Sequence, residues 1–189
     1  MGLRNIPTET PAQLASLVTA RPGMVASRSL TRDTGSSMTL LAFSAGESVS
    51  EEVYPQDVMY YLVEAWAPSA PDKGGHMAAE LIKNVAKEQI FSLSKLVEVE
   101  EEQVVSLTLS QMPGCKVTVF AIDANEGMAS HAAGGDALVT VLEGTGEITI
   151  NGVPHTLEAG ESVVIPAGAP HAVRGVTAFK MLLVVVLPA

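Results

Sequence analysis

The chain has 189 residues, a formal net charge of −10 and 47% hydrophobic residues, which is enough apolar material for a packed core. The acidic charge, without a basic stripe, predicts binding neither to nucleic acid nor to anionic membrane surfaces. The single cysteine, Cys115, excludes a disulfide within the chain and is typical of a reducing compartment. Because the N-terminal stretch also lacks the apolar core of a signal peptide, we expect a cytoplasmic protein.

An internal repeat organises the first two thirds of the chain. Residues 3–65 align without a gap on residues 82–144 at a constant offset of 79, with identities that include Asn5 with Asn84 and Val25 with Val104. The sequence identity between the two stretches is low, but the alignment has no gap and its turn glycines match. This indicates one structural unit that occurs twice.

The first copy is incomplete, because nothing in it corresponds to residues 145–189. We predict a partial repeat at 1–65, a Pro- and Gly-rich linker at 66–81, and a complete domain at 82–189. His76 lies in the linker, and no site role is expected for it. An open half sheet exposes an unpaired edge and an apolar face. We therefore expect it to pack on a complete domain, in its own chain or a neighbouring one, and we expect a homodimer.

The second copy shows the pattern of an antiparallel β protein. A short helix or turn is expected at 92–97, and turn residues such as Asn151-Gly152 separate apolar runs. Such runs at spacings of about eight to twelve residues predict a sandwich or small barrel. The expected strands are 103–110, 116–122, 137–142, 146–150, 153–157, 162–165, 171–175 and 179–187.

One stretch, 160–171, has the composition of a site. It contains a glycine turn, an apolar strand and a Pro-Ala-Gly-Ala-Pro bend, followed by His171. Proline fixes the backbone of such a bend. The imidazole of His171 is therefore expected to project from a rigid turn at the end of a strand.

This stretch resembles the second cupin motif, commonly written Gly-x5-Pro-x-Gly-x2-His-x3-Asn. The glycine, proline, glycine and histidine positions match, and Gly175 stands where the motif has asparagine. The first cupin motif is matched in part: His131 stands at its first histidine position, but Ala133 and Ala137 stand at those of its second histidine and its glutamate. On this resemblance, residues 82–189 are expected to form an all-β double-stranded β-helix, the jelly-roll or cupin barrel, with 1–65 as an incomplete second copy.

The resemblance also implies a metal site. In metal-binding cupins the two histidines and the glutamate of the first motif join the histidine of the second in holding one divalent ion. His131 and His171 are the matched ligands here, and Asp136 or His155 could complete the shell around Zn, Fe, Mn or Ni. Asp136 recurs in the first copy as Asp57, which favours a structural cap at that position.

The first copy is expected to bind no metal, since Glu52 stands at the position equivalent to His131. The acidic run 98–102 is interpreted as a solvated loop. Three functions stay open for the chain: a barrel that holds a divalent metal and a small molecule, a metal-free barrel that binds a small ligand as sensor or carrier, and a structural protein with a vestigial pocket. No nucleophile, general base with a partner or cofactor fingerprint distinguishes them, so enzymatic activity stays undecided.

Overall fold

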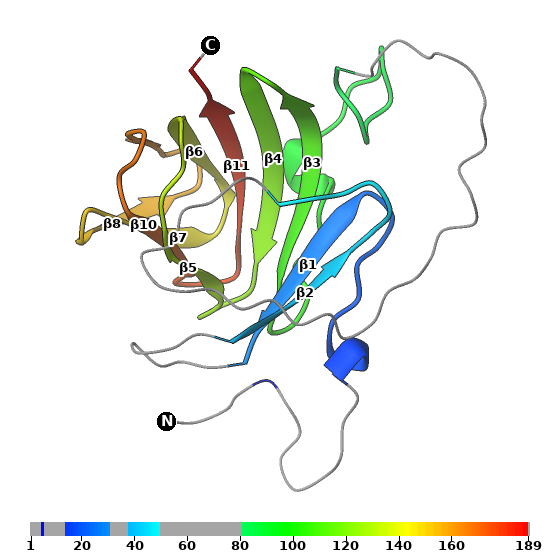
Figure 1. Ribbon diagram of the computed structural model, residues 1–189, viewed down its shortest axis with the longest axis horizontal. Helices are drawn as coiled ribbons and strands as arrows, with labels where there is room; N and C mark the ends of the chain where they lie inside the picture. The colour runs from blue at the N-terminus through cyan, green and yellow to red at the C-terminus, as the bar shows by residue number, and fades with distance from the viewer. Residues whose placement is uncertain (1–4, 6–13, 31–37, 50–80, 189) are drawn as a thin grey trace, which may run out of the picture.

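The computed structural model describes residues 5, 14–30, 38–49 and 81–188. These residues form strands and two short 3-10 helices (Figure 1). Within the same ranges the structure contains no helix with the length and hydropathy of a membrane span. The elements are η1 (Leu14–Leu17), β1 (Met24–Ser29), β2 (Thr39–Phe43), η2 (Leu93–Lys95), β3 (Val104–Met112), β4 (Cys115–Ile122), β5 (Gly127–His131), β6 (Asp136–Glu143), β7 (Thr145–Ile150), β8 (Val153–Glu158), β9 (Ser162–Ile165), β10 (His171–Gly175) and β11 (Phe179–Val186).

The eight strands predicted in the second copy all occur, with ends within two residues of the expected ones. The structure contains one further strand in the second copy, β5, which was not predicted from the sequence. Its sequence, Gly-Met-Ala-Ser-His, contains no β-branched residue and shows no clear alternation, so neither signal of a strand was present.

The strands form two antiparallel sheets that face each other. The larger sheet has the order β2-β1-β3-β4-β11-β6-β9 and the smaller one β5-β10-β7-β8. Figure 1 shows the smaller sheet stacked against the β11 and β6 side of the larger sheet, with β1 and β2 extending the other side. The predicted all-β jelly-roll fold is confirmed.

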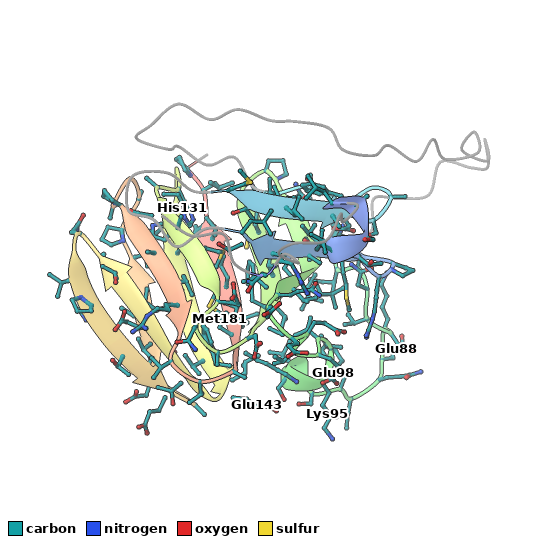
Figure 2. All side chains as sticks on the ribbon, turned by 90° about the horizontal axis from the view of Figure 1, so that it is seen from below. Glu88, Lys95, Glu98, His131, Glu143 and Met181 are labelled. Carbon is teal, nitrogen blue, oxygen red and sulfur yellow. The ribbon has the colours of Figure 1, made fainter. Side chains whose placement is uncertain are left out.

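The main core lies between the two sheets. In β6 every second residue is buried, as expected for a strand with one face on the core. The same cluster includes Phe179 and Met181 from β11 and Ile148 from β7. Met181 lies in the interior of the molecule in Figure 2.

A second apolar cluster covers the opposite face of the larger sheet. Leu93 of η2 and Val97, which follows η2, pack there against Leu107 and Val119 of the sheet. Lys180 fastens this cover, since its buried ammonium donates a 2.7 Å hydrogen bond to the carbonyl oxygen of Ser94. The outer face of the barrel is thereby closed by residues that precede β3.

The ammonium of Lys180 also lies 3.5 Å from the carboxylates of Glu98 and Glu143. A hydrogen bond from Ser94, together with the charge of Lys180, holds the pKa of Glu143 below its usual value. Figure 2 shows Glu143, Glu98 and Lys95 gathered at one side of the molecule, away from His131. This charged cluster is therefore separate from the predicted site.

The first copy joins the same sheet through the pairing of β1 with β3. The expected cover for the half sheet is thus found within one chain along this edge. The proposed boundary at residue 65, the residues Glu52 and Asp57, and the linker with His76 fall in the range 50–80, outside the described residues. The division into 1–65, 66–81 and 82–189 stays a prediction.

Candidate functional site

His131 and His171 lie directly opposite each other on neighbouring strands. The pairing of β5 with β10 sets His131 against His171, and the two ring centroids are 4.4 Å apart at an interplanar angle of 56°. Both residues are buried, with 8% and 7% of their surface exposed. The structure therefore brings together two of the four candidate residues, and their role as metal ligands stays a prediction.

Backbone carbonyl groups orient both imidazole rings in the same way. The Nδ1–H of His131 donates to the carbonyl oxygen of Ala129 at 2.8 Å, and that of His171 donates to Ala169 at 2.9 Å. A carbonyl oxygen can only accept, so the proton of each neutral ring lies on Nδ1 and the lone pair on Nε2. This is the tautomer in which Nε2 binds metal ions, and a backbone carbonyl is a usual partner for the other nitrogen.

A tight turn between β9 and β10 positions His171. The amide of Ala167 donates to Oδ1 of Asp136 at 2.8 Å, and the amide of Gly168 donates to the carbonyl oxygen of Ala133 at 2.8 Å. Gly168 adopts φ +74°, a left-handed conformation that favours glycine. The motif residues 166–170 thus act as scaffold for the histidine.

Asp136 is part of this scaffold. Its side chain is exposed and caps the 166–170 turn from the start of β6. This is the cap that the recurrence of the aspartate favoured. The carboxylate connects the larger sheet to the turn that presents His171.

Removing the Asp136 carboxylate should loosen the turn. For Asp136→Ala we expect a loss of about 1 kcal/mol in the free energy of unfolding, the scale of one hydrogen bond to a charged acceptor at the surface. Asp136→Asn keeps an acceptor oxygen and should lose less. Urea unfolding followed by circular dichroism measures both, and equal stability of Asp136→Ala and the native chain would contradict the capping role.

His155 is remote from the pair. It lies exposed on β8, opposite Ile148 of β7, and β8 is separated from β10 by β7. Neighbouring strands are about 4.8 Å apart, so a distance of about 10 Å separates the strand of His155 from that of His171. One ion cannot bridge that distance with imidazole bonds of about 2 Å.

Comparisons with known proteins identify the family of the barrel. The sequence pattern of the cupin domain family matches residues 118–187, which include both histidines. A conserved protein of unknown function from Streptococcus pyogenes is 40% identical over 60% of this chain and 99% of its own, with a TM-score of 0.58. A cupin superfamily protein from Desulfitobacterium hafniense is 29% identical over 57% of this chain and 98% of its own, with a TM-score of 0.55.

This chain belongs to the cupin superfamily. A cupin 2 conserved barrel domain protein from Leptotrichia buccalis is also similar, at 42% identity over 51% of this chain and 47% of its own, with a TM-score of 0.50. No curated protein matches the chain.

The described residues carry only part of the ligand pattern of metal-binding cupins. Within 5, 14–30, 38–49 and 81–188, no three His, Cys, Asp or Glu residues are grouped as a metal site requires. Ala133 and Ala137 stand where the family motif has histidine and glutamate, and Ala137 is buried in the core without any donor atom. Among the described residues, the side chains at the motif positions fit an ion held by two imidazoles and do not supply the four-ligand set.

The sequence analysis missed the groups that fix the tautomers. The carbonyl oxygens of Ala129 and Ala169 do this, and each belongs to the residue two positions before its histidine. Every residue carries a carbonyl, so no side-chain signature could have identified them. Two clefts in the described part of the molecule lie between the first copy and the barrel, and neither is lined by His131 or His171.

Proposed function

We propose that this cupin binds a divalent metal ion through Nε2 of His131 and Nε2 of His171, and that a small oxygen-bearing molecule completes the coordination shell. The observation that carries the proposal is the tautomer: both Nδ1 atoms donate to backbone carbonyls, which directs the lone pair of each adjacent ring to Nε2.

The barrel residues would orient and shield such a ligand. Ile150 lies beside His171 on the neighbouring strand β7, and Met128 packs against the core from β5. These apolar neighbours lower the local polarity, which strengthens electrostatic interactions at the pair. A bound ion would act as a Lewis acid toward an oxygen of the small molecule. Two protein ligands leave most of the coordination positions to that molecule and to water.

A second candidate function is metal-free binding of a small ligand. The observation that favours it is the buried Ala137 at the glutamate position, since an alanine side chain offers no carboxylate there. In this case the two Nε2 atoms would accept hydrogen bonds from the ligand. The cytoplasmic location and the absence of nucleic-acid and membrane partners stay predictions that the acidic charge and the single cysteine support.

Metal titration of the full chain tests the proposal. Chelator-treated protein is titrated with Ni²⁺ or Zn²⁺ by calorimetry, and we expect one ion per chain. His131→Ala and His171→Ala should each weaken binding at least about tenfold, since each removes one of two protein ligands. His155→Ala is the matched control, because it removes an exposed histidine from the same sheet and should leave the affinity unchanged.

The outcomes separate the functions. Metal binding that survives both His131→Ala and His171→Ala would place the ion elsewhere and contradict the proposal. Protein that takes up no metal, but whose histidine side-chain NMR signals shift with small carboxylates, would support the metal-free ligand barrel. Protein that binds no metal and shows no response to small carboxylates would support the third function, a structural protein with a vestigial pocket.

A further inference from the structure

The first copy repeats the hairpin of the second with the same register. In β1 and β2, Val25 pairs with Phe43, and in β3 and β4, Val104 pairs with Ile122. Each residue of the second pair follows its counterpart by 79 positions (25 + 79 = 104 and 43 + 79 = 122). The offset found in the sequence is therefore also an offset of strand pairing.

Smaller details repeat at the same offset. The side-chain amide of Asn5 donates to the carbonyl oxygen of Ser29 at 3.0 Å, and that of Asn84 donates to Thr108 at 2.8 Å. Both asparagines adopt left-handed backbone conformations, with φ of 54° and 63°. The amide of Ser44 donates to Met24 and that of Asp123 donates to Gln103, both at 3.1 Å.

Equivalent residues of the two copies meet where the copies join. β1 pairs antiparallel with β3, and Ala26 lies opposite Val105, its own counterpart (26 + 79 = 105). On either side of this pair, Val25 lies opposite Ser106 and Ser27 lies opposite Val104, so the pairing reads the same when the two copies are exchanged. An antiparallel contact of this kind is the geometry of a two-fold axis, as in an isologous dimer interface. The local axis here passes between Ala26 and Val105.

Two equivalent glutamates lie at the contact, although their donors are not equivalent residues. Glu47 and Glu126 are equivalent (47 + 79 = 126), and each accepts a hydrogen bond from the other copy. The ammonium of Lys83 lies 2.7 Å from Glu47, and the amide of Asn5 lies 3.2 Å from Glu126. The contact between the copies is thus two-fold in its backbone pairing, and both equivalent glutamates accept from the opposite copy.

We infer that the first copy takes the place of a second subunit on the β3 edge, and that it closes this edge against pairing with another copy of the barrel. The occupant that the edge fits is residues 81–188 of a second chain, in the register that sets Val105 against Val105. In the native chain β1 already fills this position. The cover that was expected on a complete domain, in the same chain or a neighbouring one, is provided within one chain along this edge. The homodimer stays a prediction.

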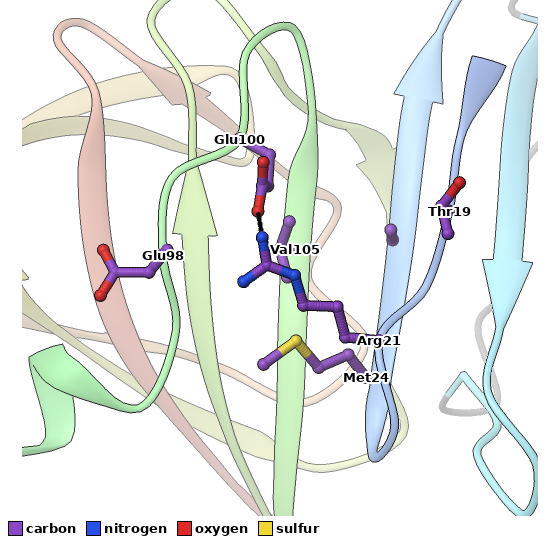
Figure 3. Close-up of a pocket in the computed structure, with 7 residues that line it drawn as sticks. Thr19, Arg21, Met24, Glu98, Glu100 and Val105 are labelled. Atoms are coloured by element: carbon purple, nitrogen blue, oxygen red, sulfur yellow. Dashed lines mark hydrogen bonds and ion pairs between the residues drawn. The ribbon is translucent and has the colours of Figure 1, made fainter.

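Charge explains why the half-copy is the preferred occupant. Arg21 and Glu100 are equivalent positions (21 + 79 = 100), and their side chains form an ion pair across the axis (Figure 3). A second barrel on this edge would instead set Glu100 against Glu100. The repulsion between two Glu100 carboxylates would disfavour the binding of a second barrel. The exposed ion pair between Arg21 and Glu100 itself adds little to the stability of the fold.

A second arginine strengthens this preference. The guanidinium of Arg28 lies 3.3 Å from Glu102, in the acidic run 98–102 that the sequence analysis interpreted as a solvated loop. The counterpart of Arg28 in the barrel is Leu107, which would bring no positive charge to Glu102. The first copy thus offers arginines to an acidic edge where a second barrel would not.

Crosslinking of the full chain tests where the first copy sits. In a Cys115→Ser background, the pair Arg21→Cys and Glu100→Cys is treated with a short bis-maleimide. We expect an internal crosslink, so that the denatured product keeps the mass of one chain, 19.7 kDa. Crosslinked dimers as the main product would show that the first copy docks on a neighbouring chain, and would overturn the inference.

A second experiment opens the edge. Ala26 is buried at the axis, with 1% of its surface exposed, so Ala26→Asp should displace β1. Glu100→Cys is added to this variant, which also removes the charges that would oppose each other. The yield of dimer crosslinked through position 100 should be at least about fivefold higher than for Glu100→Cys alone, in which Ala26 is retained. Thr156→Cys, exposed on β8 in the other sheet, is the matched control and should show no such increase.

Arg28→Glu serves as a milder displacing variant, because it sets a negative charge beside Glu102. Circular dichroism confirms that the barrel stays folded in each variant. If neither displacing variant raises crosslinking at position 100 above the Thr156→Cys control in folded protein, the β3 edge is not a two-fold surface and the inference is wrong. Neither experiment depends on metal binding, so the two proposals fail separately.

Discussion

Replacing Phe179 by alanine is expected to lower the free energy of unfolding by about 3–5 kcal/mol, the range measured for such truncations in protein cores. The ring has 1% of its surface exposed and belongs to the cluster between the two sheets. It also packs against Gly146 so closely that a Cβ there would lie 2.5 Å from the ring. The backbone of β7 already touches the ring on this side, so collapse of the cavity is restricted.

The loss expected for Phe179→Ala would be a large share of the whole free energy of unfolding, which is about 5–15 kcal/mol for native proteins. Urea unfolding followed by circular dichroism gives the free energy from the shift of the midpoint. Phe91→Ala is the matched control: Phe91 is 47% exposed, and the same change should cost less than about 1 kcal/mol. A similar loss in both variants would show that Phe179 is not the centre of the core.

The second large effect is expected for Gly127→Ala at the start of β5. A Cβ at residue 127 would lie 1.9 Å from the carbonyl oxygen of Val173 and 2.9 Å from Cα of Arg174, and both of these are backbone atoms of β10. Relief of this clash requires β5 to move away from β10. We expect a loss of about 1–3 kcal/mol or more in the free energy of unfolding.

The same displacement would reach the histidine pair. His131 lies at the other end of the five-residue strand β5, opposite His171 on β10. If the pair binds metal as proposed, Gly127→Ala should also weaken that binding at least about tenfold. Urea unfolding and metal titration of the same preparation measure the two effects.

Gly134→Ala is the control on the other side of β5, since a Cβ there would meet no atom within 4 Å. It should be close to the native chain in both measurements. If Gly127→Ala and Gly134→Ala behave alike, the close approach of β5 and β10 does not hold the histidines together.

The two proposals concern different parts of the molecule. The histidine pair lies at the joint of β5 and β10 in the smaller sheet, and the two-fold contact lies at the β1–β3 joint of the larger sheet. The Streptococcus pyogenes protein matches 60% of this chain over 99% of its own length, so a related fold occurs with about the size of the barrel alone.

Local signals in the sequence determined most of the fold. Turn residues and apolar alternation located all the described strands of the second copy except β5, because these signals act over a few residues. The spacing of Gly160, Pro166, Gly168 and His171 indicated the turn that presents the second histidine. The constant offset of 79 indicated the repeat before any strand pairing was known.

Only the tertiary structure decided which distant residues meet. It set His131 opposite His171 through β5, used Asp136 as a cap for the turn, and left His155 exposed two strands away. It also showed that the first copy joins the barrel within one chain. Strand pairing relates residues far apart in sequence, and their register depends on the whole sheet, so no local pattern specifies these contacts.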